Sequence, residues 1–509
     1  MNNQVNQHQN YDSSQLSNNN SSGGEKVYQP ISPEIYKNED LQTRNGLGSD
    51  QFPNQSFQRS SIGNRVLSKK IFIFGLILLT ILSVLVVFLL KFKSRNMSKF
   101  FGKRGEIVWW GLNEEEQVVA PLIREFEEKN PSIKVVYQKQ SPKDYKLRLV
   151  NFLNSEKGPD IFELHNSWVP VFKNQLSVLP SQIMGTDEYS KIFYPVIVQD
   201  MTTSKGVVGI PLFYDSLTLF VNQDIFSSSL STFPKTWNDF SELVDPVGGK
   251  LTLKDKGGKI IQAGAALGIT ENVDFWQDIL ALIIIQNGAD LENLNSDRVY
   301  DVINFYNLFS QRDKGVWDRT LPPSTVAFAQ GKLAMYFGPS RKAYDILKLN
   351  NNLRFKTHPL PQMPRNTPDD PNYSYANYWS QGVWEKSANR ELAWKFLKFL
   401  TEEASLEKLN QMRKKIKGFE MVSPRMSMNQ KYLQDPILGS VAALAFDAKS
   451  WYLAGETFDD ELGINNQVSK VFEKAVSSKE RQAFEVLNQE LSTILSRYEL
   501  KKKRPPVSF

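Results

Sequence analysis

Residues 71–90, IFIFGLILLTILSVLVVFLL, form an apolar run without a single charged side chain. An α-helix needs about 20 such residues to cross the roughly 30 Å of hydrocarbon in a bilayer. A cleaved signal peptide would have a shorter apolar core and a small-residue cleavage site, and neither is present. A buried core helix rarely lacks any polar face over as many as five turns. The run therefore predicts a transmembrane helix from Ile71 to Leu90.

Basic residues flank this predicted span on both sides and bear on its orientation. The cytoplasmic flank of a span carries the excess of Lys and Arg, counted within about 15 residues of its ends. Six basic residues follow the span and four precede it, which slightly favours a cytoplasmic C-terminal side. Long domains cross membranes largely regardless of such charges, so the charge count leaves the orientation open. The residues counted are Arg59, Arg65, Lys69 and Lys70 before the span, and Lys91, Lys93, Arg95, Lys99, Lys103 and Arg104 after it.

The segment before the span is polar and has no structural period. Residues 1–67 begin MNNQVNQHQNYDSSQLSNNNSSGG and are rich in Asn, Gln and Ser. Such a composition buries too little apolar surface to offset the entropy of an ordered chain. We expect a disordered polar tail over 1–67, and a basic linker over 91–104.

Net positive charge is confined to the N-terminal part of the chain. Residues 1–104 hold 13 of the 61 Lys and Arg and 6 of the 55 Asp and Glu, which leaves 48 basic and 49 acidic residues in 105–509. A nucleic-acid-binding protein carries its positive charge on the folded domain. The nearly neutral domain therefore argues against a nucleic-acid partner.

Reactive and metal-binding side chains are scarce. The chain has no cysteine, which excludes disulfides, thiolate nucleophiles and a lipidated cysteine anchor. The three histidines, His8, His165 and His358, are too few for a multi-histidine metal site. The sequence also lacks a nucleophile elbow, a zinc-protease motif, a P-loop and an EF-hand loop. We expect no metal, no cofactor and no catalytic residue.

Strands and helices alternate from Gly105 onward. Residues 106–110 and 133–137 predict strands, and the segment between them predicts a helix that starts at an Asn113 cap and ends before Pro131. A second helix over about 144–155 leads to a strand over 160–164. Strands joined in this way pair in parallel through right-handed crossovers. The pattern predicts a doubly wound α/β domain.

Aromatic and polar side chains follow two of these strands. Trp110 ends the first strand, and His165 and Trp168 follow the strand over 160–164. Ligands of open α/β sheets lie beyond the carboxyl ends of the strands, so these side chains should meet at one edge. Aromatic walls with a few polar groups are typical of a small-molecule cleft, and an aromatic ring suits the C–H face of a sugar. Packing of Trp168 under the following VPVF turn is an equally open alternative.

Eight stretches of this chain resemble extracellular solute-binding protein family 1, the substrate-binding proteins of sugar ABC transporters. They occur in the family's order over roughly residues 105–405, and the last hundred residues match more loosely. The stretches are IVWWG, IREFEEKNPSIKVVY, YKLRLVNFL, GPDIFELHNSWVP, GVVGIPLFYDSLTLFVNQDIF, PKTWNDF, AFAQGKLAMYFGPS and ANRELAWKFLKFLTEE.

The resemblance implies a two-lobe, periplasmic-binding-protein-like α/β fold over 105–509, with hinge strands between the lobes. It implies a monomeric extracytoplasmic domain that captures a carbohydrate and delivers it to ABC permease subunits. The helix Ile71–Leu90 would replace the lipid anchor in the cell membrane, with the N-terminal tail in the cytoplasm. We expect the hinge near 209–216 and at a later crossover between Lys314 and Pro339.

The resemblance also implies a set of ligand-binding residues. His165 stands where the family often has Asp, and Trp379 where it has a stacking aromatic after a glycine pair, which YWSQG replaces here. Tyr214 and Asp215 stand near the first crossing between the lobes. Each of the remaining candidates has core packing as its alternative. The full set is Trp110, His165, Trp168, Tyr214, Asp215, Trp276, Trp317, Tyr336 and Trp379.

The main alternative is a membrane-anchored glycan-active enzyme. Glu163 and Asp215 could in principle act as acid and base across a glycosidic bond. A chain with 55 acidic residues offers many such pairs, however, and a binding protein needs no reactive group. A membrane-anchored scaffold, the third class, would not need tryptophans at strand ends. The sequence therefore favours a sugar-binding protein without catalytic activity.

Overall fold

The computed structural model describes residues 105–311, 314–364, 367, 370–478 and 480–500. All described residues belong to a single compact unit of the chain. The predicted tail, the predicted transmembrane helix Ile71–Leu90 and the basic linker lie outside the described residues. Among those described, no helix combines the length and the apolar character that a membrane span requires.

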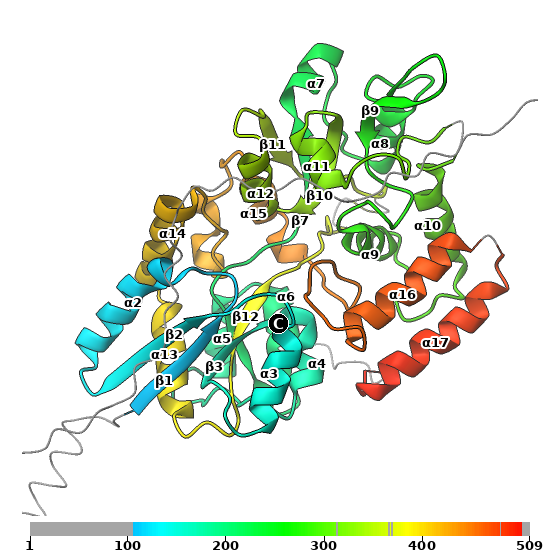
Figure 1. The fold of residues 1–509 in the computed structure, drawn as a ribbon. Coiled ribbons are helices and arrows are strands. Elements are labelled where there is room, and N and C mark those ends of the chain that lie inside the picture. The colour runs from blue at the N-terminus through cyan, green and yellow to red at the C-terminus, as the bar shows by residue number, and fades with distance from the viewer. Residues whose placement is uncertain (1–104, 312–313, 365–366, 368–369, 479, 501–509) are drawn as a thin grey trace, which may run out of the picture. The chain divides into compact units, whose positions relative to one another are not determined.

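The first lobe is built on a five-stranded sheet (Figure 1). Strand β1 pairs in parallel with β2 and β3, which confirms the prediction from the strand–helix alternation. Strand β12 returns from late in the chain and lies antiparallel between β3 and β6. The strands, in spatial order, are β2 (Ile133–Lys139), β1 (Gly105–Gly111), β3 (Ile161–His165), β12 (Trp379–Val383) and β6 (Gly209–Pro211).

Helices on both faces of this sheet bury its apolar side chains. Helix α2 (Glu116–Lys129) buries the predicted apolar stripe, which includes Leu122 and Phe126. It begins after Glu115 without a side-chain cap, so the predicted Asn113 cap is wrong. The Asn113 side-chain amide donates instead to the buried carboxylate of Glu163 in β3 at 3.1 Å.

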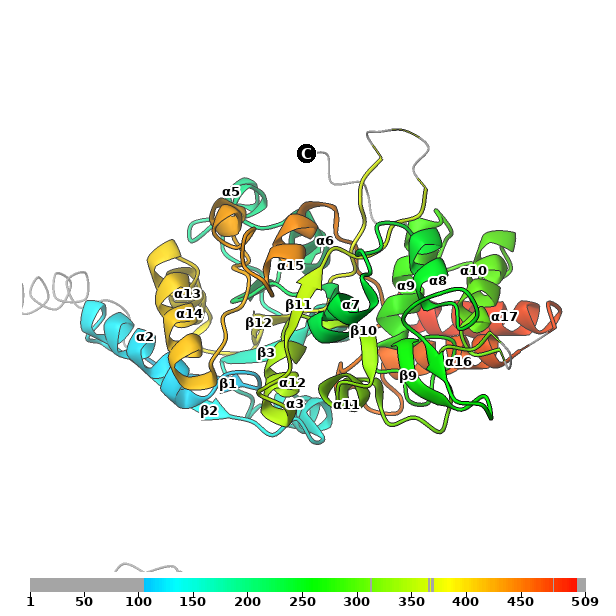
Figure 2. The same ribbon diagram turned by 90° about the horizontal axis from the view of Figure 1, so that it is seen from above.

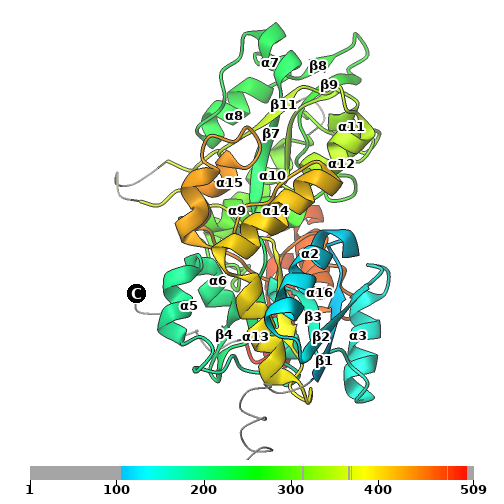
Figure 3. The ribbon, with the colours of Figure 1, turned by 90° about the vertical axis from the view of Figure 1, so that its left-hand side faces the viewer.

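Three helices of the first lobe pack against one another. Helices α2, α13 and α14 lie together on one side of the lobe (Figure 3). The remaining helices are α3 (Tyr145–Asn154), α4 (Val169–Phe172), α5 (Thr186–Ile192), α6 (Pro195–Met201), α13 (Arg390–Leu400), α14 (Glu403–Lys417) and α15 (Gly439–Ala443), with short 3₁₀ turns η1 (Asn166–Trp168), η2 (Met426–Lys431) and η3 (Ala445–Asp447) and a small ribbon of β4 (Thr202–Thr203) and β5 (Gly206–Val207).

The second lobe has its own five-stranded sheet (Figure 2). Strand β10 is central, parallel to β9 and antiparallel to β7. In spatial order the strands are β11 (Phe355–His358), β7 (Leu217–Asn222), β10 (Leu333–Pro339), β9 (Ile260–Ala265) and β8 (Leu253–Lys254). The helices are α7 (Gln223–Ser229), α8 (Trp237–Val244), α9 (Trp276–Gln286), α10 (Asp297–Leu308), α11 (Ser324–Ala329), α12 (Lys342–Leu349), α16 (Ile464–Ser477) and α17 (Ala483–Arg497).

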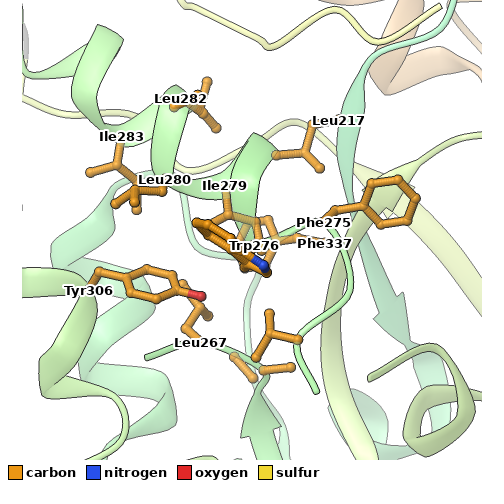
Figure 4. Packing of buried hydrophobic residues seen from close by; sticks show 14 of the residues in the cluster. Leu217, Leu267, Phe275, Trp276, Ile279, Leu280, Leu282, Ile283, Tyr306 and Phe337 are labelled. Carbon is orange, nitrogen blue, oxygen red and sulfur yellow. The ribbon is translucent and has the colours of Figure 1, made fainter. Parts of the chain in front are cut away.

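Helix α9 lies at the centre of the second lobe's core. Its sequence WQDILALIIIQ is apolar on almost every side, as expected of a helix surrounded by protein. Figure 4 shows its leucines and isoleucines packed with Trp276, Tyr306 and Phe337. Burial of this many large side chains makes the second lobe a folded body with its own core.

The chain crosses between the lobes three times, and the crossings are hydrogen-bonded to one another. The first runs from Tyr214 to Leu217, and the Leu217 amide donates to the Tyr375 carbonyl in the second at 2.8 Å. The Ala376 amide donates to the Lys449 carbonyl in the third at 2.7 Å. The first crossing agrees with the prediction near 209–216.

The predicted second crossover between Lys314 and Pro339 is wrong. Residues Leu333–Pro339 form β10, whose seven residues are all buried in the second lobe's sheet. The apolar run LAMYFGP is explained by strands on both sides of it, which is the environment of an inner strand and not of a hinge.

Candidate ligand-binding site at the junction of the two lobes

His165 stands at the carboxyl end of β3, where the first lobe meets the crossings. Gly158 and Pro159 precede the strand, which then runs fully buried to His165. One ring nitrogen, Nδ1, lies 2.7 Å from Ser167 Oγ, and Nε2 lies 3.2 Å from Asn377 Oδ1. Burial lowers the pKa of His165 to about 3, so the imidazole is neutral at physiological pH. Both ring nitrogens are therefore engaged by other protein groups.

Asn377, in the second crossing, connects both lobes. Its amide nitrogen donates to Asp278 Oδ1 at 2.7 Å and to the Gly455 carbonyl at 3.0 Å. Its carbonyl and its side-chain oxygen each accept from the Arg341 guanidinium at 3.0 Å. Since His165 shares the same side-chain oxygen, one asparagine links β3 with three segments of the second lobe.

Asp215 occupies the first crossing and is fully buried. Its carboxylate accepts from the Ser340 hydroxyl at 2.7 Å, from the Ser340 amide at 2.9 Å, and from Arg341. Burial raises the pKa of Asp215, and the Arg341 guanidinium opposes that rise. Asp215 thus fixes the first crossing to the residues that precede α12.

Asp278, in the first turn of α9, is a second buried carboxylate at the junction. It accepts from the Asn377 amide and from the Gly455 backbone amide at 2.6 Å. Burial raises its pKa to about 7, against the lowering effect of these hydrogen bonds and of Arg341. The charge on this carboxylate is therefore sensitive to pH near neutrality.

An aromatic cluster lies beside this polar network. The Trp379 ring at the start of β12 lies edge-on to His165 at 5.3 Å and to Trp168 at 5.2 Å between ring centroids. The Phe458 ring packs on it at 5.7 Å with a tilt of 32°. Among the described residues, the buried Trp168 Nε1 has no hydrogen-bond partner. The cluster therefore holds an unused donor.

Residues 455–465 of the second lobe close the junction against the first. Lys146 in α3 forms an ion pair with Asp459, and the two side chains are only 5% and 0% exposed. The Asn465 amide donates to Ser167 Oγ at 2.8 Å, next to His165. These contacts bring the two lobes together in a closed arrangement.

The structure gathers some of the predicted residues and separates others. His165, Trp168 and Trp379 are in ring contact, and Asp215 reaches them through Arg341 and Asn377. Tyr214 lies in the first crossing, with its ring 5.0 Å from that of Tyr194.

The other four candidates pack inside one lobe. Trp110 donates to Gln138 at 2.8 Å and packs on Phe152 in the first lobe. The other three belong to the core of the second lobe: Trp276, Trp317 and Tyr336. Trp317 donates to Asn272, Tyr336 accepts from Thr325, and Trp276 packs among apolar side chains, so their burial is explained without a ligand.

Several junction residues were not predicted. Arg341 had a usable signal, because it is a polar residue that closely follows the apolar strand Leu333–Pro339, whereas Asn377 had none. Lys146 and Asp459 gave none, since 313 residues separate them. Two surface cavities of about 490 and 450 Å³ lie against α17, and none of the junction residues lines either one.

Comparison with known proteins identifies the family. A family model described as bacterial extracellular solute-binding protein matches residues 121–424. The chain belongs to this family. Membership implies an extracytoplasmic solute-binding domain, and it supports the interpretation of the chain as a binding protein and not an enzyme. No significant match was found among curated protein sequences.

Solved structures of sugar-binding proteins share the fold. The sugar-binding protein MalE from Xanthomonas citri is 17% identical, with a TM-score of 0.60 over 78% of this chain and 98% of that one. An ABC substrate-binding protein from Listeria monocytogenes, in complex with cycloalternan, is 17% identical, with a TM-score of 0.58 over 78% and 100%. A solute-binding protein from Thermotoga lettingae, bound with α-D-tagatose, is 19% identical, with a TM-score of 0.57 over 77% and 100%. These likenesses establish the two-lobe α/β fold.

Proposed function

We propose that this protein captures a carbohydrate between its two lobes and delivers it to the permease subunits of an ABC importer. The observation that carries the proposal is the junction itself, where an aromatic cluster and a hydrogen-bonding network meet at the three crossings. Structural neighbours with the same fold are described as bound to sugars. Family membership and site chemistry point to the same class of ligand.

We assign the ligand contacts to His165, Trp168, Tyr214, Asp215 and Trp379. Aromatic rings cover the C–H face of a sugar, and polar groups take its hydroxyls. Because the lobes are closed here, a ligand enters only when they separate. Opening the junction exposes Trp168 Nε1, the donor without a partner among the described residues. Closure then follows if the ligand makes more contacts in the closed state than in the open one.

Packing is the role we assign to the remaining candidates, Trp110, Trp276, Trp317 and Tyr336. Each lies inside the core of one lobe, and Trp110, Trp317 and Tyr336 also have hydrogen-bond partners there. Their substitution should therefore affect stability before it affects binding.

The membrane anchor forms the second part of the proposal. Ile71–Leu90 spans the cytoplasmic membrane once, residues 1–70 are cytoplasmic, and the solute-binding domain lies outside. The extracellular family supports this orientation, and without cysteine the chain cannot carry a lipid on a cysteine side chain. Protease added to intact spheroplasts should digest residues 105–509 and spare the tail. Digestion of the tail with residues 105–509 left intact would show that the orientation is the opposite one.

A glycan-active enzyme is not favoured by the geometry. Glu163 accepts from the Leu112 and Asn113 amides, and Asp215 is held by Ser340 and Arg341. Carboxylates used in this way to hold the fold are poor candidates for proton transfer to a substrate.

A glycan panel distinguishes the two functions. The purified full-length protein in detergent should bind one or more saccharides and leave them chemically unchanged. Turnover of a bound glycan would support the enzyme, and absence of binding across mono- and oligosaccharides would contradict both.

A further inference from the structure

Exposed apolar side chains are concentrated in one part of the second lobe. Fifteen large hydrophobic side chains are exposed among the described residues, and five of these lie within residues 230–261, which we call the second-lobe tip. Single exposed apolar residues are common on soluble proteins, but a concentration of them marks a contact surface. The five are Leu230 (84% exposed), Phe233 (44%), Val247 (85%), Leu253 (46%) and Ile261 (56%).

The five side chains belong to neighbouring connections at one end of the lobe. Leu230 and Phe233 follow α7, and Val247 lies between α8 and β8. Leu253 lies in β8 and Ile261 in β9, the two strands of one hairpin. Figures 1 and 3 both show α7 and the loops around β9 at the same end of the second lobe, and α8 packs against β9. The apolar side chains are therefore presented together.

The hairpin that projects from this end has an ordered backbone. The Thr252 hydroxyl, just before β8, donates to the Val244 carbonyl at the end of α8 at 2.6 Å. In the turn, the Asp255 carboxylate accepts from the Gly257 and Lys259 backbone amides, each at 2.9 Å. Exposure of the apolar side chains on this hairpin is thus a property of its fixed fold.

The same hairpin is rich in positive charge. Residues 246–261 contain four lysines and one aspartate, a net charge of +3. Lys250, Lys256 and Lys259 are exposed and have no ion-pair partner among the described residues. Lysine on an edge strand can serve simply to prevent pairing with other chains. That explains Lys254 in β8, but neither the lysines outside the strand nor the exposed apolar side chains, which make an edge more adhesive.

Apolar side chains interspersed with lysines match the surface of an anionic membrane. The apolar groups enter the boundary between headgroups and acyl chains, and the ammonium groups lie among the lipid phosphates. The long stem of lysine allows its charge to stay at the headgroups while its methylene groups lie deeper. Neither of the two surface cavities described above lies at the tip. A projecting tip of this kind suits a broad, fluid partner better than a peptide inserted in a groove.

We propose that the second-lobe tip binds the anionic lipid surface of the membrane in which the protein is anchored. The inference rests on the anchor in the proposed function and is independent of the solute that the protein binds. Because the anchor holds the tip at a high effective concentration near lipid, a weak contact suffices. Strand β1, the first element after the anchor, belongs to the other lobe. The second contact would therefore hold both lobes at the membrane.

A single fluorophore on the tip tests this contact in the full-length protein, incorporated in nanodiscs. The chain has no cysteine, so Ile261→Cys creates a unique site for an environment-sensitive NBD label. The bilayers are phosphatidylcholine alone, or phosphatidylcholine and phosphatidylglycerol in equal parts. With phosphatidylglycerol, NBD emission should shift to the blue and rise by at least about twofold, and added salt should reverse the rise. Val486→Cys on α17, 60% exposed, is the matched control and should respond equally in both bilayers.

Charge reversal tests the role of the lysines. Reversing three exposed tip lysines should abolish the rise, because attraction to the lipid phosphates becomes repulsion. Reversing three exposed lysines of the first lobe should leave the rise unchanged. Thermal unfolding checks that both variants are folded. The tip variant carries Lys250→Glu, Lys256→Glu and Lys259→Glu, and the control carries Lys157→Glu, Lys191→Glu and Lys205→Glu.

The alternative results are distinct. Failure of the protein to enter nanodiscs refutes the anchor, and this inference with it. Incorporation with equal emission from position 261 in both bilayers refutes the lipid contact alone. A rise that survives reversal of the tip lysines refutes the assignment to anionic lipid. A rise in detergent that grows with protein concentration would identify a second copy of this chain as the occupant and overturn the proposal.

Discussion

Replacing Lys146 by Met should destabilise the protein by leaving the Asp459 carboxylate without its cation. Methionine keeps most of the side-chain volume, so the change removes chiefly the charge. Both partners are almost fully buried, and removal of one member of a buried ion pair costs about 3–5 kcal/mol. The second carboxylate nearby, Asp460, is more exposed and 3.4 Å from the ammonium, so it adds little.

The pH dependence of this loss follows from the pKa of Asp459. Burial already raises that pKa, and Lys146 opposes the rise. Without Lys146 the pKa rises further, so the folded protein takes up a proton at Asp459 at a higher pH than the unfolded chain does. Protonation removes the unpaired charge, so the loss should be largest near pH 8 and shrink toward pH 5.

Urea denaturation, monitored by tryptophan fluorescence, measures these losses in the free energy of unfolding. Lys474→Met is the matched control, because its pair with Glu490 at 2.9 Å is 57% and 41% exposed and should contribute at most about 1 kcal/mol. Adding Asp459→Asn to Lys146→Met should recover part of the loss. A loss below about 1 kcal/mol at pH 8, or one that does not shrink at pH 5, would refute the buried pair.

Three other expected outcomes use different measurements. Trp110→Ala should lower the free energy of unfolding by about 3–5 kcal/mol and leave sugar affinity within twofold; a tenfold loss of affinity in calorimetry would return Trp110 to the site. The folded pKa of His165, about 3, lies below its ordinary 6.5, so the unfolded chain takes up the proton first as pH falls. Stability should therefore fall from pH 6.5 toward pH 3 by up to about 1.4 kcal/mol per unit, and His165→Gln should flatten this slope in urea titrations; an equal slope in both proteins would contradict it. Small-angle scattering should show a smaller radius of gyration with saturating sugar, and an unchanged radius would count against lobe closure.

The start of the first lobe could be predicted closely from the sequence. The strand expected over 133–137 is Ile133–Lys139, and the helix expected over 144–155 is Tyr145–Asn154. Parallel strands buried on both faces are apolar throughout, and the helices between them carry one apolar stripe, so each element has a local signal.

The junction could not be predicted in the same way. Asn377 and Asp278 lie 99 residues apart, and a single buried asparagine has no period that distinguishes it from a surface one. The misplaced crossover has a related cause, because an apolar strand such as β10 has the same local pattern whether it is central in a lobe or leads out of it. Only the pairing of such a strand with strands distant in sequence distinguishes a central strand from one that leads out of the lobe.

The place of β12 in the first sheet has a consequence for synthesis and export. It inserts between β3 and β6, yet more than 160 residues separate it from β6 in the chain. Until residue 383 has been synthesised and has crossed the membrane, β3 and β6 each present an open edge, and His165 and Trp168 lack the strand that covers them. Open edges invite pairing with other chains, so the nascent first lobe passes through a long aggregation-prone interval. A holding chaperone outside the membrane would act on this protein chiefly while the second lobe is still emerging.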